Sequence, residues 1–399
     1  MKPTIHIDNI FLEDEKNIQP KINLNTSTNL LKNGILFIIY TTFVINIYNL
    51  DEQYKMKILI IYPIISYILN FYDTRLPILD NMLNGFYNIV CLFITPYYTY
   101  SRKQIIENPS LLSLPRSKYL HYCKSCKKKK IIDQIIVKTR DGYDMKVAVT
   151  TTALTTKTDD KCGIIFYFHG GGMCVGTAQD GMNLYFEGRN GYIVVCPSYR
   201  MAPEFKFPYS PNDCFDCVKY FINNNNNNND SIKKKYNIDI SKICLVGTSA
   251  GGGLSAAVAI ECKRNNIPIT CTSLLIPMLA PPCTESYQTN SRISTLLSCD
   301  TMLWFWRMYA SPKDYTNPLC APLFASDETL KDFPTTFLYT GTMDVLRDEG
   351  VLFGERLRKL GIKVKQIQAV GTHVGCLLSN PSILQKFIDS IFDYLEKQQ

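Results

Sequence analysis

Histidine is scarce in this sequence: the chain of 399 residues contains four, which are His6, His121, His169 and His373. The first lies in a polar N-terminal stretch and the second in a strongly basic segment. Histidine is the side chain that most often accepts a proton near neutral pH. Proton transfer by a catalytic histidine is therefore restricted to His169 and His373.

A repeated cysteine spacing is also absent, although the chain contains 15 cysteines. An odd number without a pattern argues against a disulfide framework and favours reduced thiols, which gives weak support to the cytosolic side. Cys123-x-x-Cys126 and Cys214-x-x-Cys217 match the start of a zinc or redox motif, but few further ligands lie near either pair. We therefore expect no metal site.

Excess charge is missing from most of the chain. The net charge is +8, from 43 basic and 35 acidic residues, and residues 102–130 alone hold nine basic residues and one acidic residue. The rest of the chain is balanced, which excludes a generally basic protein and predicts no nucleic-acid partner. With 46% hydrophobic and 20% charged residues, the composition is that of a globular protein and not of a disordered or collagen-like one.

Three apolar runs follow an N-terminal tail at residues 1–32 that is mixed and polar and does not resemble a secretory signal peptide. They lie at residues 33–50, 58–72 and 81–101. A helix needs about 20 residues to cross a bilayer core of about 30 Å, which the first and third runs approach and the second does not. We expect residues 33–101 to anchor the chain in a membrane; a lid of apolar helices over an active site is the alternative.

The basic segment at residues 102–130 follows three tyrosines near the end of the last apolar run. Tyrosines favour membrane interfaces, and basic segments favour the cytosolic side and anionic headgroups. We interpret the segment as a linker that fixes topology or holds the next domain near the membrane, with a simple solvated linker as the alternative. The expected location is a membrane, with the endoplasmic reticulum as a candidate and the cytosolic side favoured for the domain.

An alternating pattern of strands and helices begins after Lys130. Residues 131–149 predict a two-stranded meander that turns at Asp141-Gly142. Short apolar runs then alternate with helical stretches, and the predicted strands lie at residues 164–168, 192–196, 243–246, 270–276, 335–339 and 364–367. This pattern is typical of a mostly parallel sheet covered on both faces. The seven asparagines at residues 223–229, after a helix predicted at 213–222, are interpreted as a loop expansion.

The strongest local motif is ICLVGTSAGGG at residues 243–253. Four apolar strand residues lead into Gly247-x-Ser249-x-Gly251, and a helical stretch follows. A nucleophile elbow requires this setting, because small neighbours let the backbones approach and the helix N-terminus favours negative charge. Ser249 is therefore the predicted nucleophile, with a glycine-rich turn of no catalytic role as the alternative.

A second glycine-rich motif follows the strand predicted at residues 164–168 and consists of His169, Gly170, Gly171 and Gly172. Consecutive glycines are entropically costly to order, and a binding role explains them because their N–H groups can point at an oxyanion. With the N–H of Ala250 they would form an oxyanion hole. A flexible turn is the alternative, and His169 is interpreted as structuring the loop and not as a base.

His373 is the remaining candidate for a catalytic base, in a glycine-flanked loop after the strand predicted at residues 364–367. The acid should lie between Ser249 and His373, after a late strand. Asp344 meets this condition because it follows the strand predicted at 335–339 and a glycine turn, whereas Asp348 and Glu349 fit the next helix. The order of serine, aspartate and histidine differs from that of chymotrypsin- and subtilisin-type sites.

Together these motifs resemble the hormone-sensitive lipase branch of the α/β-hydrolase fold, which includes arylacetamide deacetylase-like esterases. The resemblance covers residues 131–399 and rests on HGGG, YRMAPEFKFP at 199–208, GTSAGG, DVLRDEG at 344–350 and His373. It implies a catalytic domain with Ser249 as nucleophile, Asp344 as acid and His373 as base, and an oxyanion hole from the HGGG backbone and Ala250. Val374 departs from the family pattern, where Gly or Ala is more usual, so a narrower site or a shifted loop is expected.

The resemblance implies a serine hydrolase that cleaves carboxylic esters of small apolar substrates without a metal or organic cofactor. The alternatives are a non-catalytic ligand-binding receptor on the same fold, which would be expected to lack a member of the catalytic set, and a membrane scaffold. The aromatic segment at residues 296–309 suits an apolar acyl pocket, with ordinary helix packing as the alternative.

Overall fold

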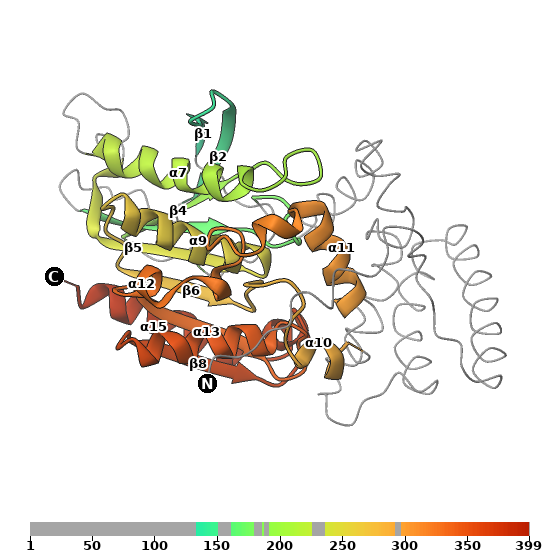
Figure 1. Ribbon diagram of the computed structural model, residues 1–399. Helices are drawn as coiled ribbons and strands as arrows, with labels where there is room; N and C mark the ends of the chain where they lie inside the picture. The colour runs from blue at the N-terminus through green and yellow to red at the C-terminus, as the bar shows by residue number, and fades with distance from the viewer. Residues whose placement is uncertain are drawn as a thin grey trace, which may run out of the picture. The chain divides into compact units, whose positions relative to one another are not determined.

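The centre of the fold is an eight-stranded sheet. The computed structural model describes residues 133–150, 161–178, 186, 191–225, 236–291 and 297–398. Its strands are β1 (Asp133–Lys138), β2 (Asp144–Thr150), β3 (Cys162–Phe168), β4 (Tyr192–Pro197), β5 (Ile238–Thr248), β6 (Cys271–Leu275), β7 (Thr335–Gly341) and β8 (Val364–Ala369). They lie in the order β1-β2-β4-β3-β5-β6-β7-β8 (Figure 1), and β2 alone runs against its neighbours. The predicted mostly parallel sheet is confirmed.

Helices cover both faces of this sheet. The longer ones are α7 (Tyr209–Asn225), α9 (Ala250–Arg264), α11 (Cys299–Tyr309), α13 (Arg347–Lys359) and α15 (Pro381–Glu396). The shorter ones are α10 (Ser286–Thr289), α12 (Asp327–Leu330), α14 (Gly375–Leu378) and the 3₁₀ turns Pro312–Asp314 and Pro322–Phe324. Helices α7, α9 and α13 contact the strands on one side, and α15 packs on the other (Figure 1).

Alternate residues of the buried strands supply these two faces, because successive side chains of a strand point in opposite directions. On β3, Tyr167 belongs to the buried cluster that contains Phe387 and Ile391 of α15. Its neighbour Phe166 points the other way and meets Phe221 of α7 edge-on, with 5.8 Å between ring centroids. Both faces are therefore apolar, which explains why the strands read as continuous hydrophobic runs.

The ends of the elements differ from the predicted ones by a few residues. Strand β5 begins at Ile238, five residues before the predicted start, because its first part contains the polar residues Asp239, Ser241 and Lys242, which hydropathy does not mark as strand. Helix α7 runs to Asn225, three residues into the asparagine tract. Asparagine is a weak helix former, but a helix that has already formed can extend over a few such residues at its end.

The carboxyl ends of four strands carry all the predicted site residues. The HGGG loop follows β3, Ser249 follows β5, Asp344 follows β7 and His373 follows β8. These strands are parallel, so their carboxyl ends lie at one edge of the sheet. This edge is where open α/β sheets bind ligands.

The predicted tail, apolar runs and basic linker at residues 1–130, with Cys123 and Cys126, lie outside the described residues. Among the helices that the structure does describe, none combines the length and the hydropathy needed to span a bilayer. The twelve described cysteines are free thiols, and ten of them are buried, including Cys214 and Cys217. Over the same residues, no three His, Cys, Asp or Glu side chains are placed to hold a metal ion.

Candidate active site

Ser249 lies at the turn between β5 and α9, with φ 58° and ψ −119°. A positive φ is unusual for a residue with a side chain and is found where the surrounding structure enforces it. A Cβ atom on Gly247 would lie 1.9 Å from the carbonyl oxygen of Gly251, and one on Gly251 would lie 1.9 Å from that of Phe168. Only glycine fits at these two positions, which explains the spacing of the motif.

Two backbone hydrogen bonds hold the serine in this turn. Its N–H donates to the carbonyl oxygen of Leu275, at 2.8 Å, and its carbonyl oxygen accepts from the N–H of Met278, at 3.0 Å. Both partners belong to the end of β6 and the segment that follows. The position of Ser249 therefore depends on residues 275–278 as well as on its own strand and helix.

Three side chains from separate strand ends meet at this turn. His373 Nε2 lies 3.0 Å from Ser249 Oγ, and His373 Nδ1 lies 2.8 Å from Asp344 Oδ2. The other carboxylate oxygen of Asp344 accepts the N–H of Leu346 at 2.9 Å. Asp344 and His373 are 1% and 5% exposed. The structure thus brings together Ser249, His373 and Asp344 in one hydrogen-bonded series.

The order of this series determines its chemistry. An ionised carboxylate only accepts hydrogen bonds, so with Asp344 ionised the proton of His373 lies on Nδ1. The lone pair of Nε2 then faces the hydroxyl of Ser249. An imidazole held in this way can take the hydroxyl proton as the oxygen attacks a carbonyl, and the buried carboxylate stabilises the imidazolium that results.

The HGGG loop lies beside the serine. A Cβ atom on Gly170 would lie 3.3 Å from the Cβ of Ser249, and Gly171 and Gly172 have φ of 113° and 59°. Within the described part of the chain, the N–H groups of Gly171 and Gly172 have no hydrogen-bond acceptor. The N–H of Ala250 opens α9, where the first turn has no acceptor inside the helix. The loop and the helix start thus offer several unpaired donors near Ser249.

His169 does not join the series with Ser249. Its ring stacks on that of Tyr199, with centroids 4.2 Å apart, and its Nδ1 lies 2.8 Å from the carbonyl oxygen of Gly170. The Tyr199 hydroxyl donates to the carbonyl oxygen of His169 at 2.8 Å. Burial lowers the pKa of His169 to about 4, so the ring is neutral at physiological pH. These contacts agree with a residue that structures the loop.

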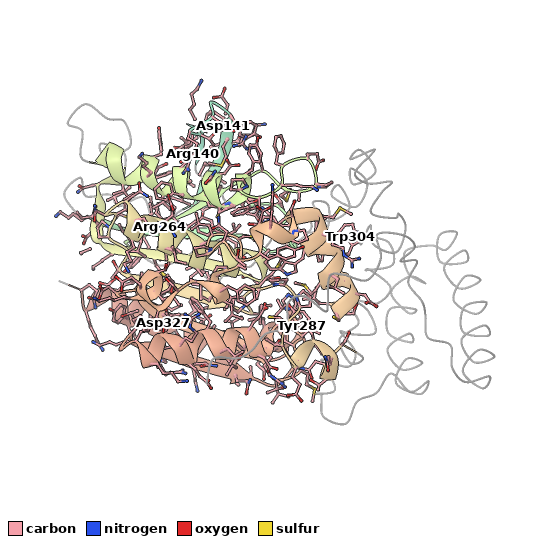
Figure 2. The ribbon with its side chains drawn as sticks, in the orientation of Figure 1. Arg140, Asp141, Arg264, Tyr287, Trp304 and Asp327 are labelled. Carbon is pink, nitrogen blue, oxygen red and sulfur yellow. The ribbon has the colours of Figure 1, made fainter. Side chains whose placement is uncertain are left out.

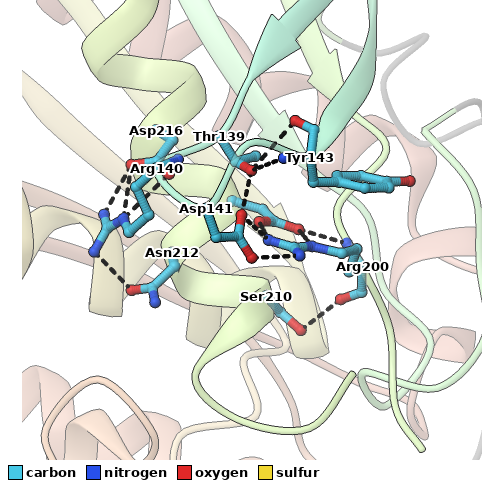
Figure 3. Close-up of polar contacts among 9 residues, drawn as sticks. Thr139, Arg140, Asp141, Tyr143, Arg200, Ser210, Asn212 and Asp216 are labelled. Atoms are coloured by element: carbon cyan, nitrogen blue, oxygen red, sulfur yellow. Dashed lines mark hydrogen bonds and ion pairs between the residues drawn. The ribbon is translucent and has the colours of Figure 1, made fainter. Parts of the chain in front are cut away.

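Arg200 anchors the segment that carries Tyr199. Its guanidinium is bonded to the carboxylates of Asp213, at 2.6 and 2.9 Å, and Asp141, at 2.7 and 3.0 Å (Figure 3). The hydrogen bonds from Arg200 hold the pKa of the Asp141 carboxyl well below its usual value. The Arg200 carbonyl accepts from the hydroxyl of Ser210 at 2.9 Å. The segment beside the HGGG loop is therefore tied to the β1–β2 turn and to α7.

Helix α11 packs against the same loop. A Cβ atom on Gly172 would lie 2.4 Å from the Phe305 ring, so that ring lies directly on the third glycine. The N–H of Phe207 donates to the carbonyl oxygen of Tyr309 at 2.8 Å, and Trp304, labelled in Figure 2, is also buried. Residues 299–309 of the aromatic segment predicted at 296–309 thus form a packed helix that contacts the glycine loop.

Val374 follows His373 with φ 64°. A β-branched residue is a genuine outlier at such an angle, whereas glycine adopts it freely. The valine occupies this conformation at the start of α14, where Gly375 N–H donates to the carbonyl oxygen of His373 at 2.7 Å. The departure from the family pattern therefore adds backbone strain next to His373.

Sequence patterns did not indicate several residues that support the site. Asn290 donates from its side chain to the Asp344 carbonyl oxygen at 2.9 Å, and Met278 holds the Ser249 carbonyl through its own N–H. Glu349, assigned correctly to the helix after Asp344, is fully buried and bonded to residues of two other segments. An acidic residue inside a helical pattern carries no signal for such burial, which depends on tertiary packing.

A family model for the alpha/beta hydrolase fold matches residues 165–377, more than half of the chain. The chain belongs to the α/β-hydrolase fold family. The match contains the HGGG loop and the three residues of the hydrogen-bonded series.

Relatives place the chain in the predicted branch of the family. It is 31% identical over 229 residues to an α/β hydrolase of Acanthamoeba polyphaga mimivirus, a match that covers 56% of this chain and 64% of the relative. It is 30% identical over 254 residues to an esterase of Gibberella moniliformis, covering 61% and 76%. It is 28% identical over 264 residues to arylacetamide deacetylase of Oryctolagus cuniculus, covering 50% and 65%. These matches confirm the resemblance to arylacetamide deacetylase-like hydrolases.

The chain spans just under two thirds of the mimivirus and rabbit relatives. Among solved structures, an esterase of Pyrobaculum calidifontis superposes with a TM-score of 0.60 at 25% identity, covering 69% of this chain and 91% of that one. This similarity supports the assignment of the fold.

Proposed function

We propose that this chain hydrolyses carboxylic esters, with Ser249 as nucleophile, His373 as general base and acid, and Asp344 as the group that orients His373. The single observation that carries the proposal is the unbroken series from Ser249 Oγ through His373 to Asp344. The names of the relatives, which are esterases and a deacetylase, support a carboxylic ester hydrolase.

The reaction divides into two acyl transfers. In the first, His373 Nε2 takes the Ser249 proton while Oγ attacks the ester carbonyl, and the imidazolium then gives that proton to the leaving alcohol. In the second, a water molecule loses a proton to the same nitrogen and attacks the acyl-enzyme. Collapse of that intermediate returns the proton to Ser249 and releases the acid. Asp344 keeps Nδ1 protonated throughout.

The oxyanion of each tetrahedral intermediate is assigned to the N–H groups of Gly171, Gly172 and Ala250, which have no acceptor among the residues that the structure describes. Donors that point at developing charge before the reaction starts lower the barrier without reorganisation. Gly170 brings the loop against Ser249, and His169 with Tyr199 holds it there. The HGGG motif thus contributes through its backbone, and His169 contributes packing.

An apolar acyl group suits this site because α11 places the Phe305 ring against the HGGG loop. Phe305 touches Gly172 itself, and Phe305 and Trp304 are both less than 10% exposed. Burial of acyl methylenes against such rings contributes about 0.8 kcal/mol each. We therefore assign esters of apolar acids as the substrate class.

Hydrolysis of p-nitrophenyl esters from acetate to palmitate tests this proposal. We expect the purified chain to turn over the apolar esters and the Ser249→Ala variant to remain at the background rate. A non-catalytic receptor on the same fold would bind the esters without turnover in both proteins. Equal hydrolysis by the wild type and the variant would remove Ser249 from the mechanism.

Membrane attachment through residues 33–101 and the basic segment 102–130 is a further part of the proposal, with 131–399 as the catalytic domain. It rests on the lengths of the apolar runs and on the concentration of charge at their end. We expect alkaline carbonate to leave the full chain in the membrane pellet and to release a truncation that begins at Lys130. Release of the full chain by carbonate would contradict an anchor that spans the bilayer.

A further inference from the structure

Glu349 is a buried carboxylic acid that the proposed mechanism does not use. It lies in the first turn of α13, five residues after Asp344, and is 0% exposed. Buried acids are rare unless they are paired or hydrogen-bonded, because desolvation penalises the charged form. The hydrogen bonds of the Glu349 carboxyl group therefore indicate what this buried acid does.

The carboxyl group of Glu349 joins two other segments to α13. Its Oε1 accepts the N–H of Leu279 at 3.0 Å, and its Oε2 accepts the hydroxyl of Tyr287 at 3.3 Å. Leu279 lies in the segment after β6, and Tyr287 lies in the short helix α10 (Figure 2). One side chain thus connects α10, the segment after β6 and the segment that carries Asp344.

The segment after β6 is also the one that anchors Ser249. Met278 donates its N–H to the Ser249 carbonyl, and the next residue, Leu279, donates to Glu349. The same segment packs tightly on the start of α9: a Cβ atom on Gly252 would lie 2.8 Å from Pro277, and one on Gly253 would lie 2.1 Å from the Met278 carbonyl oxygen. A movement of this segment would therefore displace the serine.

The segment that carries Asp344 is fixed by α10 through further bonds. Ser286 Oγ donates to the Val345 carbonyl oxygen at 2.7 Å, and the N–H of Ser286 donates to Asp348 Oδ2 at 2.7 Å. Asn290 donates to the Asp344 carbonyl oxygen at 2.9 Å. Tyr287 lies between Ser286 and Asn290 in the chain, and its hydroxyl donates to Glu349 Oε2, so α10 is bonded to Glu349 as well as to the segment that carries Asp344.

We propose that Glu349 is a positioning residue for the acyl transfer, whose carboxyl group fixes the distance between the segment that anchors Ser249 and the segment that carries Asp344. This inference rests on the proposed function. His373 must reach both residues at once, at 3.0 and 2.8 Å, so a small change in their separation breaks one of its two hydrogen bonds. Misplacement by about 1 Å reduces rates by about 100-fold.

The surroundings of Glu349 favour its neutral form. The titratable groups that face it are Tyr287 of α10, Cys283 of the preceding segment and Asp344, while Leu279 and Ala280 contribute backbone N–H groups. Arg347 is directed elsewhere, to Asp348 and to the carbonyl oxygen of Thr342. Burial, with Asp344 close by, raises the pKa of Glu349 well above its usual range. Glutamine therefore reproduces both the shape and the charge of this residue.

Three substitutions test the inference. Glu349→Met fills the same space without an acceptor for the Leu279 N–H, Glu349→Gln keeps an acceptor, and Glu355→Met makes the same change on the exposed side of α13. With p-nitrophenyl butyrate, we expect Glu349→Met to lower kcat about 10- to 100-fold with KM within about threefold. Glu349→Gln and Glu355→Met should stay within about threefold of the wild-type kcat.

Active-site titration with a fluorophosphonate separates positioning from folding, because it counts competent serines. For Glu349→Met we expect nearly full labelling at a slower rate. Wild-type kcat per titrated site in this variant would overturn the inference, as would an equal loss in Glu349→Gln.

If Glu349→Met does not fold, Tyr287→Phe provides the test: it should lower kcat two- to fivefold per titrated site, and an unchanged kcat would overturn the inference. A wild-type chain without any turnover would instead reject the proposed function.

Discussion

The His373→Ala variant should hydrolyse esters roughly 10⁴ to 10⁶ times more slowly than the wild type. His373 provides the only imidazole within hydrogen-bonding distance of Ser249 Oγ among the described residues, and without it the hydroxyl keeps its proton. Asp344, 1% exposed, would also lose the imidazole that contacts its Oδ2. The measurement is kcat/KM for p-nitrophenyl butyrate.

His6→Ala is the matched control for this change, because it removes a histidine far from the motifs in the sequence. It should leave kcat/KM unaltered. A residual rate in His373→Ala within tenfold of the wild type would show that another group acts as the base. Circular dichroism and thermal unfolding of both variants verify that the comparison is between folded proteins.

A second large effect is expected from Gly171→Ala, for which we predict a kcat about 10² to 10³ times lower. Gly171 has φ 113°, and a Cβ atom would lie 2.0 Å from the carbonyl oxygen of Val175. The loop has to move to accept the methyl group, and the N–H groups assigned to the oxyanion move with it. Steady-state kinetics with p-nitrophenyl butyrate measure the loss.

Gly142→Ala provides the control for a glycine with positive φ. Gly142 has φ 84° in the turn between β1 and β2, and a Cβ atom there would have no neighbour within 4 Å. Its substitution should lower the melting temperature slightly through backbone strain and leave kcat intact. If Gly171→Ala folds and keeps the wild-type kcat, the HGGG loop does not stabilise the oxyanion.

The sheet could be predicted because its pattern is local. Runs such as residues 164–168 and 243–246 are apolar on both faces, and that property is visible in the sequence without knowledge of the partners. The elbow could be predicted because its residues form one continuous motif, although only Gly247 is required by a contact within the turn; a Cβ atom on Gly251 would meet the carbonyl oxygen of Phe168 in β3. The order of Ser249, Asp344 and His373 then followed from which loops come after which strands.

The supporting contacts could not be predicted because they join distant parts of the chain. Glu349 meets Leu279, 70 residues away in sequence, and Arg200 meets Asp141, 59 residues away. Phe305 lies on Gly172 although nothing in either stretch indicates the other. The left-handed backbone of Val374 also departs from what a β-branched residue prefers. Such features depend on how the segments pack and not on their own composition.

Labelling with a fluorophosphonate, followed by peptide mapping, tests the central claim most directly. This reagent forms a covalent bond with a serine that an adjacent base activates. The account predicts one adduct per chain, on the peptide that contains Ser249, and no adduct in Ser249→Ala or in heat-denatured wild type. An adduct on a different residue, or labelling of Ser249→Ala at the wild-type rate, would contradict it.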